Sequence, residues 1–227
     1  MPRSVLCLLF LSVAALGCHD GPMFALKRVN PFFLNEWRQD EKLGATDHRR
    51  RQELHKLANS IDRYSAAEQA KWMVHLEQIM TNDPSPEMRH LAVRAAGKVA
   101  GDDAFQLVEQ GLDDQNLKVR MAACAALEGR PEPAAVTLLA KTAGESVDLD
   151  FRQAAIRALR GHEGQQVNDA LKLALRDSDP ALRYAAIDSL KQVTGKDLGN
   201  RPDLWVAYLD GEPVDEDAGG FSLGELF

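Results

Sequence analysis

Apolar side chains recur at the same positions around four arginines, Arg89, Arg120, Arg152 and Arg183, which are 31, 32 and 31 residues apart. In each copy the residue before the arginine is apolar, the third after it is alanine, and the fourth and seventh after it are small or aliphatic. Positions at these offsets share one face of an α-helix. The pattern therefore predicts four helices that each bury the same face.

A turn signal rich in Asp, Asn, Ser or Pro precedes each of these helices, at residues 82–86, 112–116, 145–150 and 176–180. Such residues cap or begin helices. A further amphipathic segment precedes each turn, at residues 66–80, 104–112, 134–143 and 167–175. The repeating unit is thus helix, turn, helix. Because such units bury their apolar faces only by stacking, we expect an all-α fold, a right-handed α-solenoid.

The order of turn Asp or Pro, apolar residue, Arg, Ala and aliphatic residues resembles HEAT repeats, most closely the short form of phycobilisome-lyase-type HEAT proteins. The resemblance covers roughly residues 83–195, with all four copies in register. One copy departs from the pattern, since Ser146 stands where the others have Asp83, Asp114 and Asp177. The resemblance implies stacked HEAT repeats, an architecture that hosts scaffolds, adaptors and a few enzymes.

The four arginines lie at the border of the buried face on a helical wheel. Their stems can cover the alanines while their guanidinium groups reach a turn carboxylate or a backbone carbonyl. We therefore interpret Arg89, Arg120, Arg152 and Arg183 as structural residues of the repeat. A ligand-binding role for this column of arginines is the alternative.

Composition agrees with a folded helical protein, because 45% of the residues are hydrophobic and 27% are charged. The chain holds 27 basic and 34 acidic residues and has a formal net charge of −7. Nonspecific binding of nucleic acid depends on basic surfaces. The charge balance therefore disfavours a nucleic-acid partner.

The first residues have the features of an export signal. Arg3 is followed by an apolar run over residues 5–16, which is short for a membrane span. The end of this run, "AALGC", resembles a bacterial lipobox, with Ala15 where that motif usually has Leu. We therefore expect a signal peptide over residues 1–17, a lipid on Cys18, and a protein of the bacterial cell envelope, lipid-anchored and facing the periplasm or the exterior.

The rest of the chain divides into three predicted parts. Residues 18–45 form an N-terminal tether or cap, since their aromatic residues could cover the open end of the solenoid or rest on the membrane. Residues 46–197 form the solenoid, beginning with a degenerate repeat whose apolar positions are Leu54, Leu57, Ile61, Trp72, Leu76 and Ile79. Residues 198–227 form a short cap helix near residues 204–209 and an acidic tail.

The sequence contains no phosphate loop, CxxC pair, HExxH or GxSxG motif. Its six histidines are scattered without ligand spacing, and Cys124 occupies an apolar position of its helix. We therefore predict no enzyme activity, cofactor or metal. The predicted function is a protein-interaction scaffold, with a bilin-lyase-like enzyme, or a chaperone of a chromophore-binding protein, as the alternative that the resemblance implies.

The positions one, five and eight after each arginine point away from the buried face of the second helix, which in this fold lines the concave side. This outward stripe is mildly basic, and a role only in facing water is one interpretation of it. As a binding surface it would hold an acidic or mixed peptide, including the chain's own tail folded back as an autoinhibitor. The predicted partner-binding residues are His90, Arg94, Met121, Arg157, Arg160, Tyr184 and Lys191.

Overall fold

The computed structural model describes residues 46–214, and within this range all regular structure is helical. The chain divides into two compact units, residues 1–52 and 53–227. Of the first unit only residues 46–52 are described, where α4 (Asp47–Ser60) begins. The predicted signal peptide, Cys18, the tether and the tail from residue 215 onward lie outside the described residues.

The second unit consists of helices that alternate between the two positions of a repeat. The first helices of the repeats are α5 (Ala66–Asn82), α7 (Asp102–Leu112), α9 (Pro133–Glu145) and α11 (Gln165–Leu175). The second helices are α6 (Pro86–Ala96), α8 (Leu117–Leu127), α10 (Leu149–Ala158) and α12 (Pro180–Thr194). Short 3-10 turns follow α4, at Ile61–Arg63 (η1), and α10, at Leu159–Gly161 (η2).

Side chains in the turns start the second helices. The carboxylate of Asp179 accepts a hydrogen bond from the Ala181 amide, and Asn116 accepts one from Lys118. Asp148 accepts from both Asp150 and Phe151. These bonds satisfy amides that have no partner within the helix, which is why the turn residues marked the helix starts correctly.

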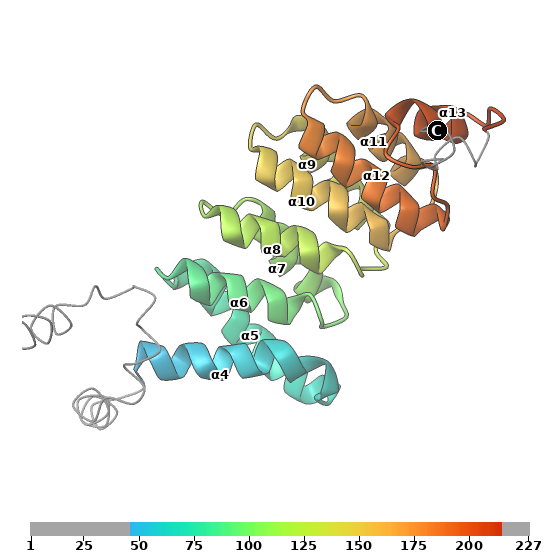
Figure 1. The fold of residues 1–227 in the computed structure, drawn as a ribbon. Coiled ribbons are helices and arrows are strands. Elements are labelled where there is room, and N and C mark those ends of the chain that lie inside the picture. The colour runs from blue at the N-terminus through green and yellow to red at the C-terminus, as the bar shows by residue number, and fades with distance from the viewer. Residues whose placement is uncertain (1–45, 215–227) are drawn as a thin grey trace, which may run out of the picture. The chain divides into compact units, whose positions relative to one another are not determined.

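The second helices lie side by side in the order α6, α8, α10, α12, and each packs against a first helix of its own repeat (Figure 1). Their shared face is buried as the spacing predicted. The alanines three positions after each arginine, Ala92, Ala123, Ala155 and Ala186, are all 0% exposed. Ala123 faces the first helix of its own repeat, where a Cβ on Gly111 of α7 would lie 3.1 Å from the Ala123 Cβ, so a small side chain at this position lets the two helices approach closely. The all-α solenoid expected from the sequence is therefore confirmed.

The prediction that Trp72 is a core residue is wrong. Trp72 is 38% exposed and packs edge-on against His75, whereas Met73, Leu76 and Met80 form the buried stripe of α5. Residues 73, 76 and 80 follow helical spacing, and Trp72 lies one residue, about 100° of rotation, away from Met73. The large apolar side chain of Trp72 suggested a core residue, but its position on the helix faces away from the core.

The last described helix, α13 (Pro202–Leu209), lies where the sequence predicted a short cap helix. Its Trp205 is fully buried, and the indole Nε1 donates a hydrogen bond to the Gly199 carbonyl at 3.0 Å. The helix packs against α11 and α12. An aromatic side chain with a satisfied polar atom thus covers the apolar end of the last repeat.

Candidate partner-binding groove

The repeat arginines join successive repeats. The guanidinium of Arg89 forms a bidentate pair with Asp114 of the next turn, with Nε–Oδ2 and Nη2–Oδ1 distances of 2.7 and 3.0 Å. Its Nη1 also donates to the Asp83 carbonyl at 2.9 Å. The hydrogen bonds to Arg89 hold the pKa of Asp114 below its usual range, while the same pairing raises the pKa of Arg89. The Arg89 side chain therefore links its own turn to the turn of the next repeat.

The other three arginines have comparable partners. Arg120 lies 3.3 Å from Asp148, and Arg152 lies 2.5 Å from Asp177. Arg183, in the last repeat, donates from Nη1 to the carbonyls of Asp177 and Ser178, both at 2.8 Å. The structure places all four guanidinium groups on turn carboxylates or carbonyls.

The exceptional Ser146 shows what the turn aspartate does in the other copies. Asp114 accepts a hydrogen bond from the Asn116 amide and also pairs with the arginine of the preceding repeat. In the third copy these roles are divided. The Ser146 hydroxyl accepts from the Asp148 amide at 3.2 Å, and Asp148 supplies the carboxylate for Arg120. The turn is retained without the aspartate.

Two further links between repeats were missed by the sequence analysis. Arg130 is 5% exposed, pairs with Glu132 at 2.6 Å, and donates to the carbonyls of Val99 and Gly101. His162 Nε2 lies 2.9 Å from the Leu127 carbonyl. Both residues stand ten positions after a repeat arginine. This shared position in the repeat is the sequence feature that could have identified both links, but an arginine in one copy and a histidine in the other hide it.

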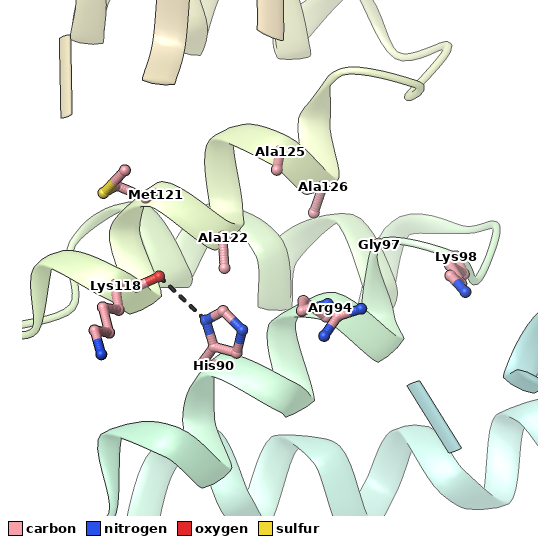
Figure 2. A pocket seen from close by; sticks show the side chains of 9 residues that line it. All are labelled: His90, Arg94, Gly97, Lys98, Lys118, Met121, Ala122, Ala125 and Ala126. Atoms are coloured by element: carbon pink, nitrogen blue, oxygen red, sulfur yellow. Dashed lines mark hydrogen bonds between the residues drawn. The ribbon is translucent and has the colours of Figure 1, made fainter. Parts of the chain in front are cut away.

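A groove of about 600 Å³ lies between α6 and α8, on the outward side of the second helices. Figure 2 shows side chains from both helices around it. Its lining is His90, Arg94, Gly97, Lys98, Lys118, Met121, Ala122, Ala125 and Ala126.

The groove exists because its floor is made of small residues. Ala122, Ala125 and Ala126 line it from α8 without filling it. At one end the helices nearly touch, since a Cβ on Gly97 would lie 2.6 Å from the Cβ of Ala126. Longer side chains at these alanines would occupy the space. The groove is therefore a consequence of small-residue packing between two repeats.

Basic side chains surround this apolar floor. His90, Arg94, Lys98 and Lys118 are the ionisable residues of the lining, and none of its residues is acidic. The His90 ring lies 3.3 Å from the Lys118 carbonyl (Figure 2). The Arg94 Nη2 lies 3.4 Å from the Asn59 side-chain oxygen. In a chain of net charge −7, this is a local concentration of positive charge.

The structure brings three of the seven predicted partner-binding residues into the groove: His90, Arg94 and Met121. The other four lie in later repeats, Arg157 on α10, Arg160 in η2, and Tyr184 and Lys191 on α12. Arg157 on α10 and Tyr184 on α12 are exposed. Arg160 pairs with Glu128 at 2.8 Å, which raises the pKa of Arg160, and Lys191 pairs with Asp197 at 2.8 Å.

The groove also contains residues that the sequence analysis did not select. Lys118 stands two positions before a repeat arginine and Lys98 nine positions after one, so neither falls on the predicted stripe. Ala125 does occupy the fifth position after Arg120 but carries no polar group that would mark it.

Reactive groups do not gather in the described part of the chain. Burial raises the pKa of the Cys124 thiol to about 12, which keeps it protonated and unreactive. Residues 46–214 contain no cluster of three His, Cys, Asp or Glu side chains that could hold a metal ion. Within the same range, no helix is long and apolar enough to cross a membrane.

Comparison with known proteins supports this interpretation of the repeats. The family described as HEAT repeats matches residues 73–160, which include the whole groove. A phycobilisome maturation protein from Synechococcus elongatus is 36% identical over 104 residues. This similarity covers 40% of the chain and 50% of that relative, so the chain spans about half the length of the relative it matches. With their helical pairs and linking arginines, residues 73–160 of this chain are HEAT repeats, and the helical pair α11 and α12 continues the same arrangement.

Proposed function

We propose that this protein is a non-catalytic scaffold that binds an acidic, partly apolar segment of a partner protein in the groove between α6 and α8. The observation that carries the proposal is the combination of an apolar alanine floor with four basic side chains and no acidic one. HEAT repeats are an architecture of protein-interaction scaffolds, which supports the broader class.

The groove matches such a segment in size and chemistry. Its volume of about 600 Å³ can take a few side chains, and burying one Leu or Phe contributes about 1.5–3 kcal/mol. Ion pairs at a solvent-exposed rim add about 0.2–1 kcal/mol each. Apolar burial would therefore supply most of the affinity, and the cations would select acidic over basic segments.

A peptide-binding measurement tests the proposal. The probe is a fluorescent twelve-residue peptide that alternates Asp or Glu with Leu or Phe, with a Lys-containing analogue as its counterpart. Charge reversal at Arg94 and Lys118 together, Arg94→Glu with Lys118→Glu, should weaken binding about tenfold or more, because two attractive pairs become repulsive.

The matched control is Lys141→Glu, an exposed lysine on the first helix α9. It alters the net charge in the same direction but lies outside the groove, so binding should stay unchanged. Thermal unfolding of each variant verifies that the fold is kept. Equal binding by wild type and the double variant, or a preference for the basic analogue, would remove the groove as the site.

The proposal includes a location, the bacterial cell envelope with the chain anchored by a lipid on Cys18. It rests on the basic start, the apolar run and the small residues before that cysteine. Metabolic labelling with palmitate should mark the wild-type protein and not Cys18→Ser. Equal labelling of the two would mean that Cys18 is not the lipid site.

The alternative is a bilin-lyase-like enzyme or a chaperone of a chromophore-binding protein. The similarity to a protein named for phycobilisome maturation favours it. Incubating the purified protein with bilins and recording absorbance separates the two functions. A spectral shift or a covalent adduct would support the alternative, and an unchanged spectrum would support the scaffold.

A further inference from the structure

We propose that the groove between α6 and α8 is covered by the chain's own residues 215–227 when no partner is bound. The inference rests on the proposed function and adds autoinhibition to it, since the partner's segment must then displace the chain's own tail.

The tail and the groove have complementary chemistry. Residues 215–227 read "DEDAGGFSLGELF" and contain four acidic residues, four large apolar residues and no basic one. The groove presents the converse, an alanine floor bordered by His90, Arg94, Lys98 and Lys118. Leu226 and Phe227 can fill the floor while Glu225 pairs with a rim cation.

The tail is long enough to arrive there. The chain leaves α13, which packs on α11 and α12, and the row α12, α10, α8 leads from there to the groove. Packed helices lie about 8–10 Å apart, so the path across this row measures roughly 25–30 Å. Thirteen extended residues span up to roughly 45 Å. The last residues of the tail, Glu225, Leu226 and Phe227, can therefore reach the groove, whereas Phe221, seven residues after Val214, spans at most roughly 25 Å.

The order of charges along the tail suits this path. Asp215, Glu216 and Asp217 come first, and the apolar residues follow after two glycines. Arg157 on α10 stands at the same repeat position as Arg94, is exposed, and forms no ion pair with another described residue. The acidic start would pass Arg157 before the apolar part enters the groove.

Such a tail lowers the apparent affinity for a partner. At an effective concentration of about 1 mM, a tail with an intrinsic Kd on the order of 100 μM reduces binding of an external peptide about tenfold. The tail then competes for the groove, so only partner segments that bind more tightly than the tail displace it.

Carbodiimide cross-linking of the full chain tests the docking directly, because the reagent joins a carboxylate to an amine only when they are in contact. Mass spectrometry should find links from Glu225 to Lys98 or Lys118. Lys71 on α5 and Lys141 on α9 are exposed lysines outside the groove and serve as internal controls. A mixture of ¹⁵N-labelled and unlabelled protein separates links within one chain from links between chains.

Absence of tail links to Lys98 and Lys118, equal links to the control lysines, or links only between chains would each overturn the inference. Ala125→Phe provides a second test, because Ala125 is exposed and a phenyl ring there fills the floor without removing a lysine. This variant should lose the groove links and keep the thermal midpoint of the wild type. Retained links would mean that the tail lies elsewhere.

The peptide probe distinguishes failure of this inference from failure of the proposed function. In the full chain, Leu226→Ser with Phe227→Ser should bind the acidic probe about tenfold more tightly than wild type. Equal binding by the two chains overturns the autoinhibition and leaves the groove as a partner site. No binding by either chain overturns the proposed function, and the inference with it.

Discussion

Gly161→Ala is the substitution that most directly tests how the repeats are joined. A Cβ built on Gly161 would lie 1.8 Å from the Glu128 carbonyl oxygen and 2.7 Å from its carbonyl carbon. These are backbone atoms, so no side-chain rotation relieves the overlap. Gly161 is not among the glycines with positive φ, and alanine can adopt its backbone conformation. The cost therefore comes from the contact between repeats alone.

The expected loss in free energy of unfolding follows from the contacts that weaken when the overlap pushes η2 away from α8. Moving η2 away from the end of α8 weakens the hydrogen bond of His162 to Leu127, worth about 0.5–1.5 kcal/mol. It also weakens the partly exposed Arg160–Glu128 ion pair, worth about 0.2–1 kcal/mol. Overpacking of a tight contact adds about 1–3 kcal/mol. We expect Gly161→Ala to lower the free energy of unfolding by about 2–5 kcal/mol.

Urea and thermal unfolding followed by circular dichroism measure this change, which corresponds to a fall in Tm of about 5–15 °C. The matched control is Gly129→Ala. Gly129 also lacks a positive φ, and a Cβ at this position would meet no neighbouring heavy atom within 4 Å. The control substitution should be neutral or stabilising by up to about 1 kcal/mol. Equal midpoints for the two variants would refute the close approach of η2 to α8.

Two further predictions concern the same joints. Ala155→Leu should destabilise the protein by about 1–3 kcal/mol, because Ala155 is 0% exposed and occupies the repeat position at which Ala123 lies against Gly111 of α7. An unchanged urea midpoint would show that the packing register is wrong. Asp114→Asn should cost about 1–3 kcal/mol near pH 7. Since the folded pKa of Asp114 is lowered, its contribution is present above about pH 4 and is lost as the pH falls through the folded pKa. Unfolding midpoints measured from about pH 7 to about pH 2 should therefore converge for wild type and variant, and a constant gap would contradict the Arg89–Asp114 pairing.

The sequence by itself determined the repeating unit. Helix faces follow from spacing within about ten residues, so the alanines at 92, 123, 155 and 186 and the starts of the second helices could be placed without a structure. Trp72 marks the limit of this reasoning. Its large apolar side chain suggested burial, but its position on the helix leaves it partly exposed.

The tertiary structure decided what lies between repeats. Asp114 is 25 residues from Arg89, and nothing local states that this arginine reaches the carboxylate of the next turn as well as the carbonyl of its own. The groove likewise depends on two helices about one repeat apart, whose short side chains leave space while Lys98 and Lys118 border it. Periodicity is a property of one segment, whereas a groove or an ion pair between repeats is set by the distance and orientation of two segments, which depend on packing across the whole stack.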